Sequence, residues 1–408
     1  MARTSTIITA LALLAAPTSA KVFFKETFGD DWEDRWVKST TWKSEDQMGT
    51  WDHTAGKWYG DENDKGIQTG EDAKHYGLSA LVPEPFTQTG DLVLQYTVKW
   101  EQKIDCGGAY IKLGPKSDQA AFGGDSPYSI MFGPDICGGT RKTHVIFNYP
   151  SKGENLEMKK TVAPLSDQKS HLYTLHLTAD GSYEVFIDEV SKAKGKLEEG
   201  WDFMEPKEIK DPEQSKPEDW VDTKKIPDPE DVKPEGYDDI PATIPDPEAA
   251  KPEDWEDEDD GEWEPPTIPN PEYKGPWKAP MIDNPEYKGE WVHPLVANPE
   301  FKEDATLPVR CVDCALVGFE LWQVKAGSIF DDIIVTDSLE EAKAFAQETF
   351  FAKKDGEQKM LDDIEEEKKA AAKEAAEKAK AAKAEEKEAE EEGADEEEAE
   401  EEESHDEL

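Results

Sequence analysis

Between Ile209 and Glu303 the chain is built from two short sequence patterns, each of which occurs three times in succession. In the first pattern, the A unit, an Ile-x-Asp-Pro motif precedes Lys-Pro-Glu, and its copies begin at Ile209, Ile226 and Ile244. In the second, the B unit, Gly-x-Trp precedes Asn-Pro-Glu-(Tyr/Phe)-Lys, and its copies begin at Gly261, Gly275 and Gly289. Repeated units of this size contact only their neighbours. Three A units followed by three B units therefore predict a hairpin in which outgoing A units pair with returning B units.

Proline dominates this segment. Residues 205–303 hold 19 of the chain's 28 prolines, together with 30 acidic and 11 basic side chains. Proline fixes φ and removes a backbone donor, so neither a helix nor a central strand can run through the segment. Few aliphatic residues remain to form a core, but one aromatic residue per unit allows small clusters between facing units. We expect a long, thin arm; the alternative is a disordered, proline-rich acidic linker.

Both ends of the chain carry targeting signals. Arg3, an apolar stretch over residues 7–16 and small residues up to Ala20 are typical of a secretory signal peptide over residues 1–20. That stretch is too short to span a bilayer, and no other stretch is as apolar, so we expect a soluble mature protein. The last four residues, His405-Asp-Glu-Leu, match the receptor-read retention address of the endoplasmic reticulum. Together the two signals predict residence in the lumen of the endoplasmic reticulum.

The net charge of −48 excludes some partner classes and suggests others. A chain without a basic surface is a poor ligand for nucleic acid or anionic lipid. From Glu385 to Leu408 there are 16 acidic residues and one lysine. Carboxylate oxygens suit Ca²⁺, and without a fixed loop geometry the affinity should be weak, on the order of 10⁻⁴–10⁻³ M. The tail over residues 357–408 is therefore expected to bind calcium in quantity.

Apolar and polar residues alternate outside the arm in the manner of β-strands. The clearest examples are residues 92–100, 143–148, 171–177, 183–187, 316–324 and 329–336. Many short strands with turn residues between them predict a mostly β fold, an antiparallel sandwich. Because strand-like sequence resumes after the arm, residues 21–204 and 304–356 are expected to form one sandwich, into which the arm over residues 205–303 is inserted.

A helix is expected to follow the last strand. Ser338-Leu-Glu-Glu341 is a capping-box sequence, and an Ala/Glu/Lys-rich run continues from it to about Glu392. The run holds many i,i+4 charge pairs and almost no apolar stripe. Its first turns can dock on the sandwich through Ala342, Phe345, Ala346 and Phe350.

The four cysteines suit an oxidising compartment. A bridge between Cys106 and Cys137 would close a loop of about 30 residues and contribute roughly 3–4 kcal/mol. Cys311-Val-Asp-Cys314 is compatible with a local disulfide, a reduced pair or a redox motif. No thioredoxin-like βαβ pattern surrounds this pair, which disfavours a catalytic dithiol.

The paired Lys-Pro-Glu-Asp-Trp and Asn-Pro-Glu-Tyr-Lys-Gly repeats, the sandwich divided around them, the acidic tail and the retention signal resemble the calreticulin and calnexin family. The resemblance covers essentially the whole mature chain. It implies a jelly-roll, legume-lectin-like sandwich that binds monoglucosylated N-glycans on unfinished glycoproteins, and an arm whose tip recruits a protein disulfide isomerase. Calnexin continues into a transmembrane helix, for which this sequence has no candidate.

The resemblance assigns sugar-contacting positions within three motifs. These are Tyr110 and Lys112 in Cys-Gly-Gly-Ala-Tyr-Ile-Lys, Tyr128, Met131 and Asp135 in the segment that ends at Cys137, and Glu320 and Trp322 in Gly-Phe-Glu-Leu-Trp. Aromatic faces suit the C–H surfaces of sugars, and charged groups suit their hydroxyls. Glu320 departs from the aspartate that calreticulins usually carry and matches calnexin instead.

A calcium site and a partner-binding tip are also implied. The family's high-affinity calcium site uses one Asp side chain and backbone carbonyls, which correspond here to Asp331 and to Asn63 and Lys65; Thr27 stands in place of the usual Gln. The isomerase-docking tip corresponds to Glu258, Asp260, Glu262 and Trp263. An acidic knob with one Trp suits a basic patch with an apolar socket. Two features depart from the family pattern, the Cys311/Cys314 pair and Gly236-Tyr237 in the middle A unit.

These observations favour a monomeric, non-enzymatic, calcium-binding lectin chaperone. One alternative is a calcium store that holds polypeptides without sugar selectivity. Another is an oxidoreductase that uses Cys311 and Cys314. A third is glycoside hydrolysis, which needs two opposed carboxylates, for which Asp135 and Glu320 are the candidates.

Overall fold

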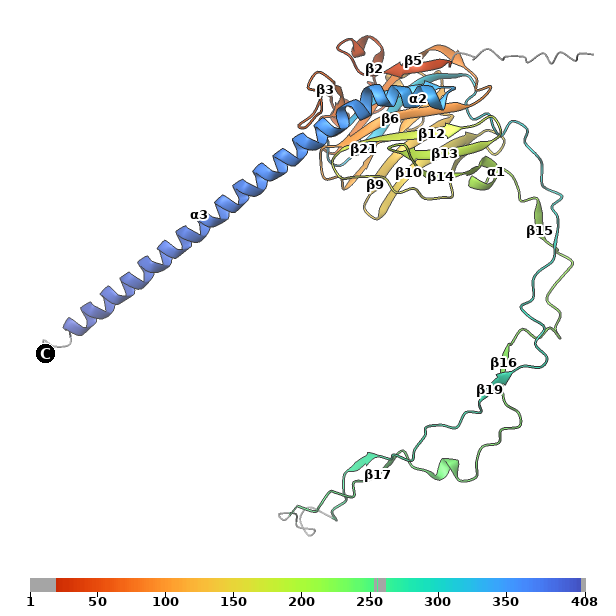
Figure 1. Cartoon of the computed structure of the whole chain (residues 1–408), viewed down its shortest axis with the longest axis vertical. Coiled ribbons are helices and arrows are strands. Elements are labelled where there is room, and N and C mark those ends of the chain that lie inside the picture. The colour runs from red at the N-terminus through yellow and green to blue at the C-terminus, as the bar shows by residue number, and fades with distance from the viewer. Residues whose placement is uncertain (1–19, 253–254, 256–261, 405–408) are drawn as a thin grey trace, which may run out of the picture. The chain divides into compact units, whose positions relative to one another are not determined.

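Two antiparallel sheets of eight strands each pack face to face (Figure 1). The computed structural model describes residues 20–252, 255 and 262–404, and for residues 381–404 it describes the backbone alone. In the helix-facing sheet the order is β14-β13-β12-β6-β22-β4-β3, with β1 beside β22. Its strands are β1 Val22–Glu26, β3 Trp51–Thr54, β4 Gly66–Thr69, β6 Leu92–Trp100, β12 Ser170–Leu177, β13 Ser182–Ile187, β14 Val190–Lys196 and β22 Ser328–Thr336.

The second sheet carries the predicted sugar-binding residues and is called the site-bearing sheet below. Its order is β11-β10-β9-β7-β21-β5-β2, with β8 beside β21 and β9. Its strands are β2 Trp36–Lys38, β5 Lys74–Phe86, β7 Cys106–Gly108, β8 Ile111–Pro115, β9 Ile130–Cys137, β10 Thr140–Tyr149, β11 Glu154–Glu157 and β21 Cys314–Gln323. Short helical turns lie at Trp32–Asp34, Glu45–Gln47, Gln119–Ala121 and α1 Leu197–Gly200.

Large aromatic residues fill the space between the two sheets. Phe319 of β21 and Phe330 of β22 lie on opposite sheets, and their rings are 4.5 Å apart between centroids. Both side chains are fully buried, as are Trp100, Tyr96 and Phe132. The Tyr96 hydroxyl donates to the carbonyl of Ala109 at 2.7 Å, so its polar atom is satisfied inside the core. Burying each such ring contributes about 1.5–3 kcal/mol, and the alternation seen in the sequence is what directs these rings inward.

The two strands that follow the arm complete the sandwich. Strand β21 lies between β7 and β5, and β22 lies between β6 and β4. Neither sheet can form without them, so the arm is inserted into one sandwich, as the sequence predicted. The chain divides into two compact units, one of residues 1–204 with 302–408 and the other of residues 205–301.

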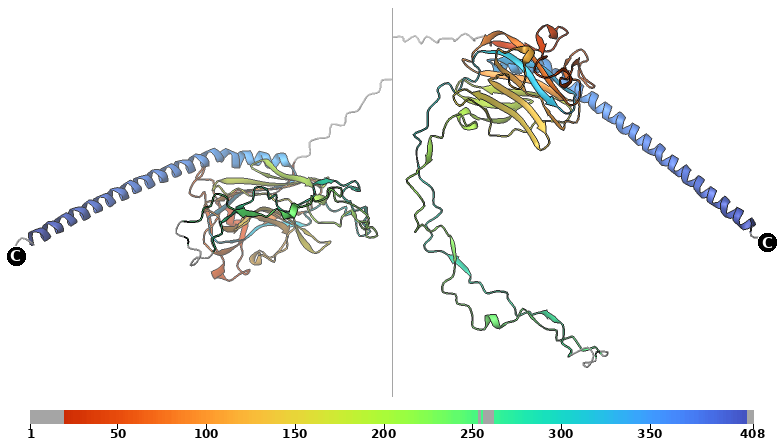
Figure 2. Two further views of the ribbon diagram at one scale, coloured as in Figure 1. Left: turned by 90° about the horizontal axis from the view of Figure 1, so that it is seen from below. Right: turned by 180° about the vertical axis from the view of Figure 1, so that it is seen from behind.

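The first part of a long helix lies against the helix-facing sheet (Figure 2). It comprises α2 Leu339–Ala346, a π-helical turn Gln347–Phe351 and α3 Ala352–Ser404. The Ser338 side chain accepts from the backbone N–H of Glu341, which confirms the predicted cap. The four predicted docking residues, Ala342, Phe345, Ala346 and Phe350, are buried at 3 % exposure or less.

The predicted end of this helix, near Glu392, is wrong, because the helical backbone continues to Ser404. Alanine and glutamate both have high intrinsic helix propensity, which the single Gly393 does not outweigh. None of the helices within the described ranges has the length and apolar character that a membrane span requires.

The arm is a hairpin whose A and B units face one another (Figure 1). Its strand pairs are β15 Glu208–Lys210 with β20 Leu295–Ala297, β16 Lys225–Pro227 with β19 Met281–Asp283, and β17 Thr243–Pro245 with β18 Thr267–Pro269. The first A unit therefore pairs with the last B unit, as predicted. At the centre of each pair two aliphatic residues face each other, as Ile226 faces Ile282.

The same hydrogen bonds recur at each pair, which we call a rung. In the middle rung, the Asn284 side chain donates to the carbonyl of Thr223 at 2.9 Å and accepts from the N–H of Glu286 at 3.0 Å. Asn270 and Asn298 make the equivalent bonds in the other rungs. The Asn-Pro-Glu motif thus satisfies backbone groups that proline leaves without ladder partners. In the middle A unit, which departs from the family pattern, Gly236 has φ of 79° and begins a 3₁₀ turn, Tyr237–Asp239.

Candidate functional site

The predicted sugar-binding residues lie on three neighbouring strands of the site-bearing sheet and on the segments that flank them. Lys112 of β8 is opposite Met131 of β9 and opposite Gly318 of β21, two residues before Glu320. Side chains two residues apart on a strand share a face. Tyr110 and Lys112 are two residues apart, as are Glu320 and Trp322, while Met131 and Asp135 are four residues apart.

An ion pair occupies the centre of the site. The Lys112 ammonium donates to the Glu320 carboxylate at 2.8 Å and lies 4.9 Å from the centroid of the Tyr128 ring. The side chains of Lys112 and Glu320 are only 4 % and 14 % exposed. A cation held between a carboxylate and an aromatic face is fixed in position. It can present its remaining donors to hydroxyl groups.

Two tyrosines beside this pair remain neutral phenols. Burial raises the pKa of Tyr110, and the negative charges of Glu320 and Asp135 raise it further. Burial and the charge of Glu320 likewise raise the pKa of Tyr128. Both hydroxyls therefore keep their protons at any physiological pH and can both donate and accept.

His144 of β10 belongs to the site, although nothing in the sequence beyond strand alternation marks this residue. Its Nε2 lies 3.1 Å from the Asp135 carboxylate and its Nδ1 lies 2.7 Å from that of Glu157. Its ring meets the Tyr110 ring edge-on at 5.9 Å. Asp135 is thus oriented by a neighbour on the next strand.

An aromatic row forms the other side of the site. The Trp322 ring is 40 % exposed and lies 4.7 Å from the ring of His75, which in turn lies 5.1 Å from the ring of Trp42. Burial and the nearby Lys43 lower the pKa of His75, which favours a neutral, stackable ring. Trp42 and His75 were not predicted to belong to the site. Trp42 lies in a loop and His75 lies at the beginning of β5, and only the folded structure brings them beside Trp322.

The absence of a side chain at Gly124 keeps the space between the aromatic row and the ion pair open. A Cβ atom at Gly124 would lie 3.8 Å from a carboxylate oxygen of Glu320 and 3.9 Å from the Trp42 ring. A larger residue there would extend between the groups that are expected to touch a sugar.

The Cys106–Cys137 disulfide, one of the predicted possibilities, joins β7 to β9 at one end of the site. The two residues are directly opposite in the strand register, with their Cα atoms 3.8 Å apart. The bond closes the loop that contains Tyr110, Lys112, Tyr128 and Met131. It holds both sugar-binding segments against each other.

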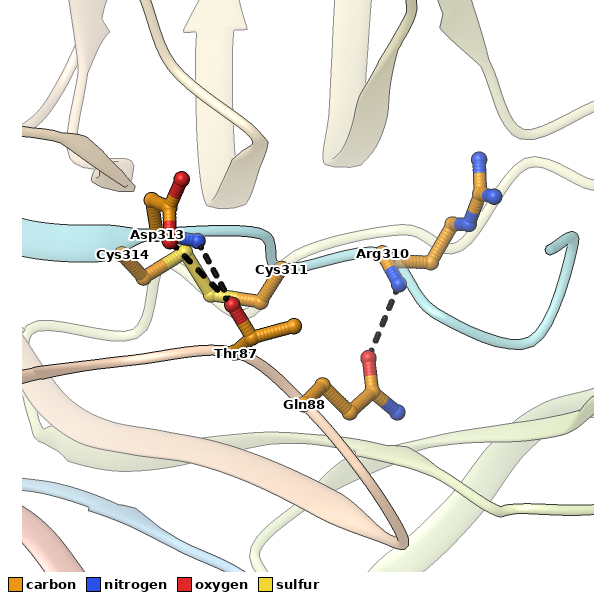
Figure 3. The surroundings of a disulfide bond; sticks show 6 residues. All are labelled: Thr87, Gln88, Arg310, Cys311, Asp313 and Cys314. Atoms are coloured by element: carbon orange, nitrogen blue, oxygen red, sulfur yellow. Dashed lines mark hydrogen bonds between the residues drawn. A yellow bond between two sulfur atoms is a disulfide. The ribbon is translucent and has the colours of Figure 1, made fainter.

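Cys311 and Cys314 also form a disulfide, so all four cysteines are paired (Figure 3). Both residues are fully buried. The loop that carries them is tied to the end of β5: the N–H of Arg310 donates to the Gln88 side chain at 2.8 Å and the N–H of Asp313 donates to the Thr87 hydroxyl at 3.1 Å. Of the three open interpretations, the structure holds the local disulfide.

The residues predicted to bind calcium lie where β22 meets the loop before β4. Asp331 is buried, and its Oδ1 has no hydrogen-bond partner among the described residues. Burial, Asp332 and Asp64 raise its pKa, since nothing present compensates its charge fully. Lys65 precedes Gly66, whose Cβ position is 3.2 Å from the Asp331 Cβ.

The same loop and strand bring the other two predicted calcium ligands into the neighbourhood. Asn63 is in the loop with Lys65, and Thr27 follows Glu26, which pairs with Ile333 of β22. Within the described part of the chain, no cluster of three or more His, Cys, Asp or Glu side chains is arranged as a metal site. A buried carboxylate oxygen without a hydrogen-bond partner fits one ligand position of a hard cation.

The predicted partner-binding tip is described only in part. Glu258 and Asp260 lie outside the described residues. Glu262 is exposed and Trp263 is half-buried.

The two carboxylates considered for glycoside hydrolysis both have basic partners, because Asp135 lies beside His144 and Glu320 lies beside Lys112.

Several known proteins are similar to this chain over most of its length. A family model described as the Calreticulin family matches residues 24–260 and 257–335. Calreticulin of Dictyostelium discoideum is 58 % identical over 346 residues, covering 84 % of this chain and 81 % of the relative. Calreticulin of Chlamydomonas reinhardtii is 58 % identical over 364 residues, covering 88 % and 86 %.

A solved structure gives the same result. The T. cruzi calreticulin globular domain superposes with a TM-score of 0.60 at 31 % identity, and the match covers 85 % of this chain and 99 % of that domain. The chain belongs to the calreticulin family, whose members are calcium-binding chaperone lectins of the endoplasmic reticulum lumen and not enzymes.

Proposed function

We propose that this protein is a calcium-dependent lectin chaperone that binds monoglucosylated N-glycans on folding glycoproteins. The observation that carries the proposal is the Lys112–Glu320 ion pair, held at 2.8 Å between neutral tyrosines on one side and the Trp322–His75 row on the other. This is a set of fixed polar groups beside an exposed aromatic face. No bond needs to be broken for such a site to act.

Each group has a role that its surroundings support. Trp322 offers a half-exposed ring on which the C–H face of a hexose can stack. Glu320 and Asp135 accept from hydroxyls, while Lys112, Tyr110 and Tyr128 donate. Met131 lies opposite Lys112 and supplies an adaptable apolar contact.

Calcium has two roles in the proposal. At the site built from Asp331 and the carbonyls of Thr27, Asn63 and Lys65, it would supply positive charge to a buried carboxylate and thereby stabilise the sandwich. In the acidic tail it would be bound weakly and in large amount. The first role is structural and the second is storage.

The arm is proposed to recruit a partner. Glu258, Asp260, Glu262 and Trp263 form an acidic segment with one aromatic residue, which suits a basic surface with an apolar socket on a protein disulfide isomerase. Retention by the receptor that recognises the terminal His-Asp-Glu-Leu would keep the monomeric protein in the lumen.

The test is calorimetric titration of a terminally glucosylated oligomannose into the mature, calcium-loaded protein. The same oligomannose without glucose is titrated in parallel. Trp322→Ala, which alters an exposed side chain, should abolish the selective heat, while Trp291→Ala in the arm should leave it unchanged. Equal heats for both glycans, or none, with a folded protein would refute the lectin function.

That negative outcome would favour calcium storage and polypeptide holding without sugar selectivity, because the acidic tail does not depend on the sandwich surface. An oxidoreductase function is the weaker alternative. Cys311 and Cys314 are bonded and fully buried. Insulin reduction that disappears in a Cys311→Ser/Cys314→Ser variant would be needed to support it.

A further inference from the structure

A small cavity separates strand β22 from the first turn of α3. Its volume is about 50 Å³, and its lining includes Gly60, Asp64, Asp331, Asp332 and Lys353. Five carboxylate residues line it, Asp61, Asp64, Asp331, Asp332 and Glu357, together with three lysines, Lys99, Lys353 and Lys354. Of the four residues of the proposed calcium site, Asp331 lines this cavity, and Asp64 and Gly66, which also line it, flank Lys65 in the sequence.

The two aspartates on β22 are unusual in being adjacent and both buried. Asp331 and Asp332 are 7 % and 3 % exposed. The strand register shifts between Asp331 and Ile334, and Asp332 has φ of 53°. This irregularity turns consecutive side chains toward the same cavity instead of to opposite faces. One oxygen of each carboxylate, Oδ1, has no hydrogen-bond partner among the described residues.

Lys353 is the cation that faces these carboxylates. Its ammonium lies 3.6 Å from the Asp332 carboxylate and is bonded to that of Asp64. The two other lysines that line the cavity pair with other carboxylates, Lys99 with Glu101 at 3.3 Å and with Glu357 at 3.9 Å, and Lys354 with Asp188 at 3.5 Å.

The backbone around Lys353 is packed against the calcium-site loop. A Cβ atom at Gly60 would lie 2.2 Å from the Lys353 carbonyl oxygen, so only glycine fits there. Gly60 begins the loop that continues through Asn63 and Lys65 to β4. The first turn of α3 and the loop that holds the proposed carbonyl ligands thus touch directly.

We propose that Lys353 is a resident cation of the calcium site, which competes with Ca²⁺ for the aspartates and couples calcium binding to the docking of α3. The inference rests on the proposed calcium site. An ammonium fixed beside the aspartates repels a divalent ion and lowers its affinity. By thermodynamic reciprocity, bound calcium weakens the hold of the aspartates on Lys353, and so loosens the first turn of the helix.

The test is calcium titration of the full-length protein with a chelator-buffered calorimetric assay, which separates one tight site from the weak sites of the tail. Lys353→Gln should tighten the site by about tenfold or more, because it removes a full charge in a partly desolvated place. Lys353→Arg, which keeps the charge, should stay within about threefold of the parent. Lys359→Gln is the matched control, since Lys359 lies on the same helix and pairs with Asp363 at its surface.

Amide hydrogen exchange of residues 352–360 gives a second measurement that is independent of ligand affinity. Calcium should speed exchange in the parent protein and have no such effect in Lys353→Gln. Unchanged or weaker calcium binding by Lys353→Gln, with exchange that is insensitive to calcium in the parent, would overturn the inference.

Asp331→Asn separates the two proposals. If it abolishes tight calcium binding while Lys353→Gln has no effect, the calcium site stands and the role of Lys353 fails. If the parent protein binds no calcium tightly, or if Asp331→Asn binds as the parent does, both proposals fail. A thermal melt of each variant without calcium shows that the sandwich is folded before titration.

Discussion

The Lys112 ammonium donates to the Glu320 carboxylate at 2.8 Å and thereby joins the middle of β8 to β21, the strand that follows the arm. Both side chains are largely buried, and desolvation makes such pairs poor contributors to stability. An apolar pair of the same size would hold the two strands together at least as well. The presence of the Lys112–Glu320 ion pair at this place is therefore better explained by binding than by folding.

Replacing one member of this pair should lower both the stability of the fold and the affinity for glycan. Glu320→Gln leaves a buried ammonium with a neutral partner, which should cost about 1–3 kcal/mol of unfolding free energy and weaken glycan binding about tenfold or more. Urea unfolding and calorimetric titration measure the two effects.

Two controls sharpen that prediction. Glu320→Asp keeps the charge and should retain most of the binding. Glu154→Gln alters an exposed carboxylate on β11 of the same sheet and should change neither property. Full binding by Glu320→Gln would contradict the assigned role of this carboxylate.

The two disulfides should contribute unequally to stability. Opening Cys106–Cys137, which closes a sequence separation of 31 residues, should lower the unfolding free energy by about 3–4 kcal/mol. Opening Cys311–Cys314, which spans 3 residues, should cost about 2 kcal/mol. Urea unfolding of the two paired Cys→Ser variants tests this ranking, and the reverse order would contradict it.

Each rung of the arm should be locally independent. Asn284→Ala removes the side-chain bonds to Thr223 and Glu286 and should weaken the middle rung by about 1–2 kcal/mol. Amide exchange at Ile226 and Ile282 should accelerate, while the outer rungs and the melting of the sandwich should not change. Lys278→Ala, at an exposed site in the arm, is the control.

A buried histidine should make stability depend on pH. His171 lies 2.7 Å from Asp167 and 2.9 Å from Asp188. Burial would lower the pKa of His171, but these carboxylates outweigh it and raise the pKa above its ordinary value of 6.5. The ion pairs therefore stabilise the fold fully below pH 6.5 and lose their effect as the pH rises through the raised pKa.

Unfolding free energies measured at a series of pH values from about 6 to 9 test this effect. The pH at which roughly half of the stabilising free energy is lost marks the pKa of His171 in the folded state. His171→Gln should flatten the profile in that window. His293→Gln in the arm should leave it as in the parent. A parent stability that is constant or rises across the window would contradict the assignment.

Features with a local, repeated signal were predictable from the sequence. The facing of A and B units followed from their order, and the Ser338 cap followed from three neighbouring residues. The choice between a disulfide bond and a reduced dithiol at Cys311 and Cys314 could not be predicted from the sequence, since the same spacing allows both. The structure shows the two sulfur atoms bonded and both residues buried.

The sugar-binding face was predicted only as far as the family motifs extend. Trp42 and His75 reach Trp322 from a loop and from a long strand, and no period in the sequence marks either residue. His144 lies beside Asp135 because β10 pairs with β9, which is a tertiary relationship. The end of α3 was predicted too early, because the helix propensity of alanine and glutamate carries the helical backbone on to Ser404.

The hydrogen bonds of each rung are closed within one facing pair of units, and this has a consequence for how such an arm can change in evolution. Losing or duplicating an A unit together with its B partner alters the arm by a whole rung and leaves the remaining bonds intact. Losing one unit alone shifts the register of every pair beyond it. The length of the arm can therefore change only by whole rungs. Each such change needs matched insertions or deletions at two places in the gene. For the middle rung these places are about 60 codons apart, because Thr223 and Asn284 are separated by 61 residues.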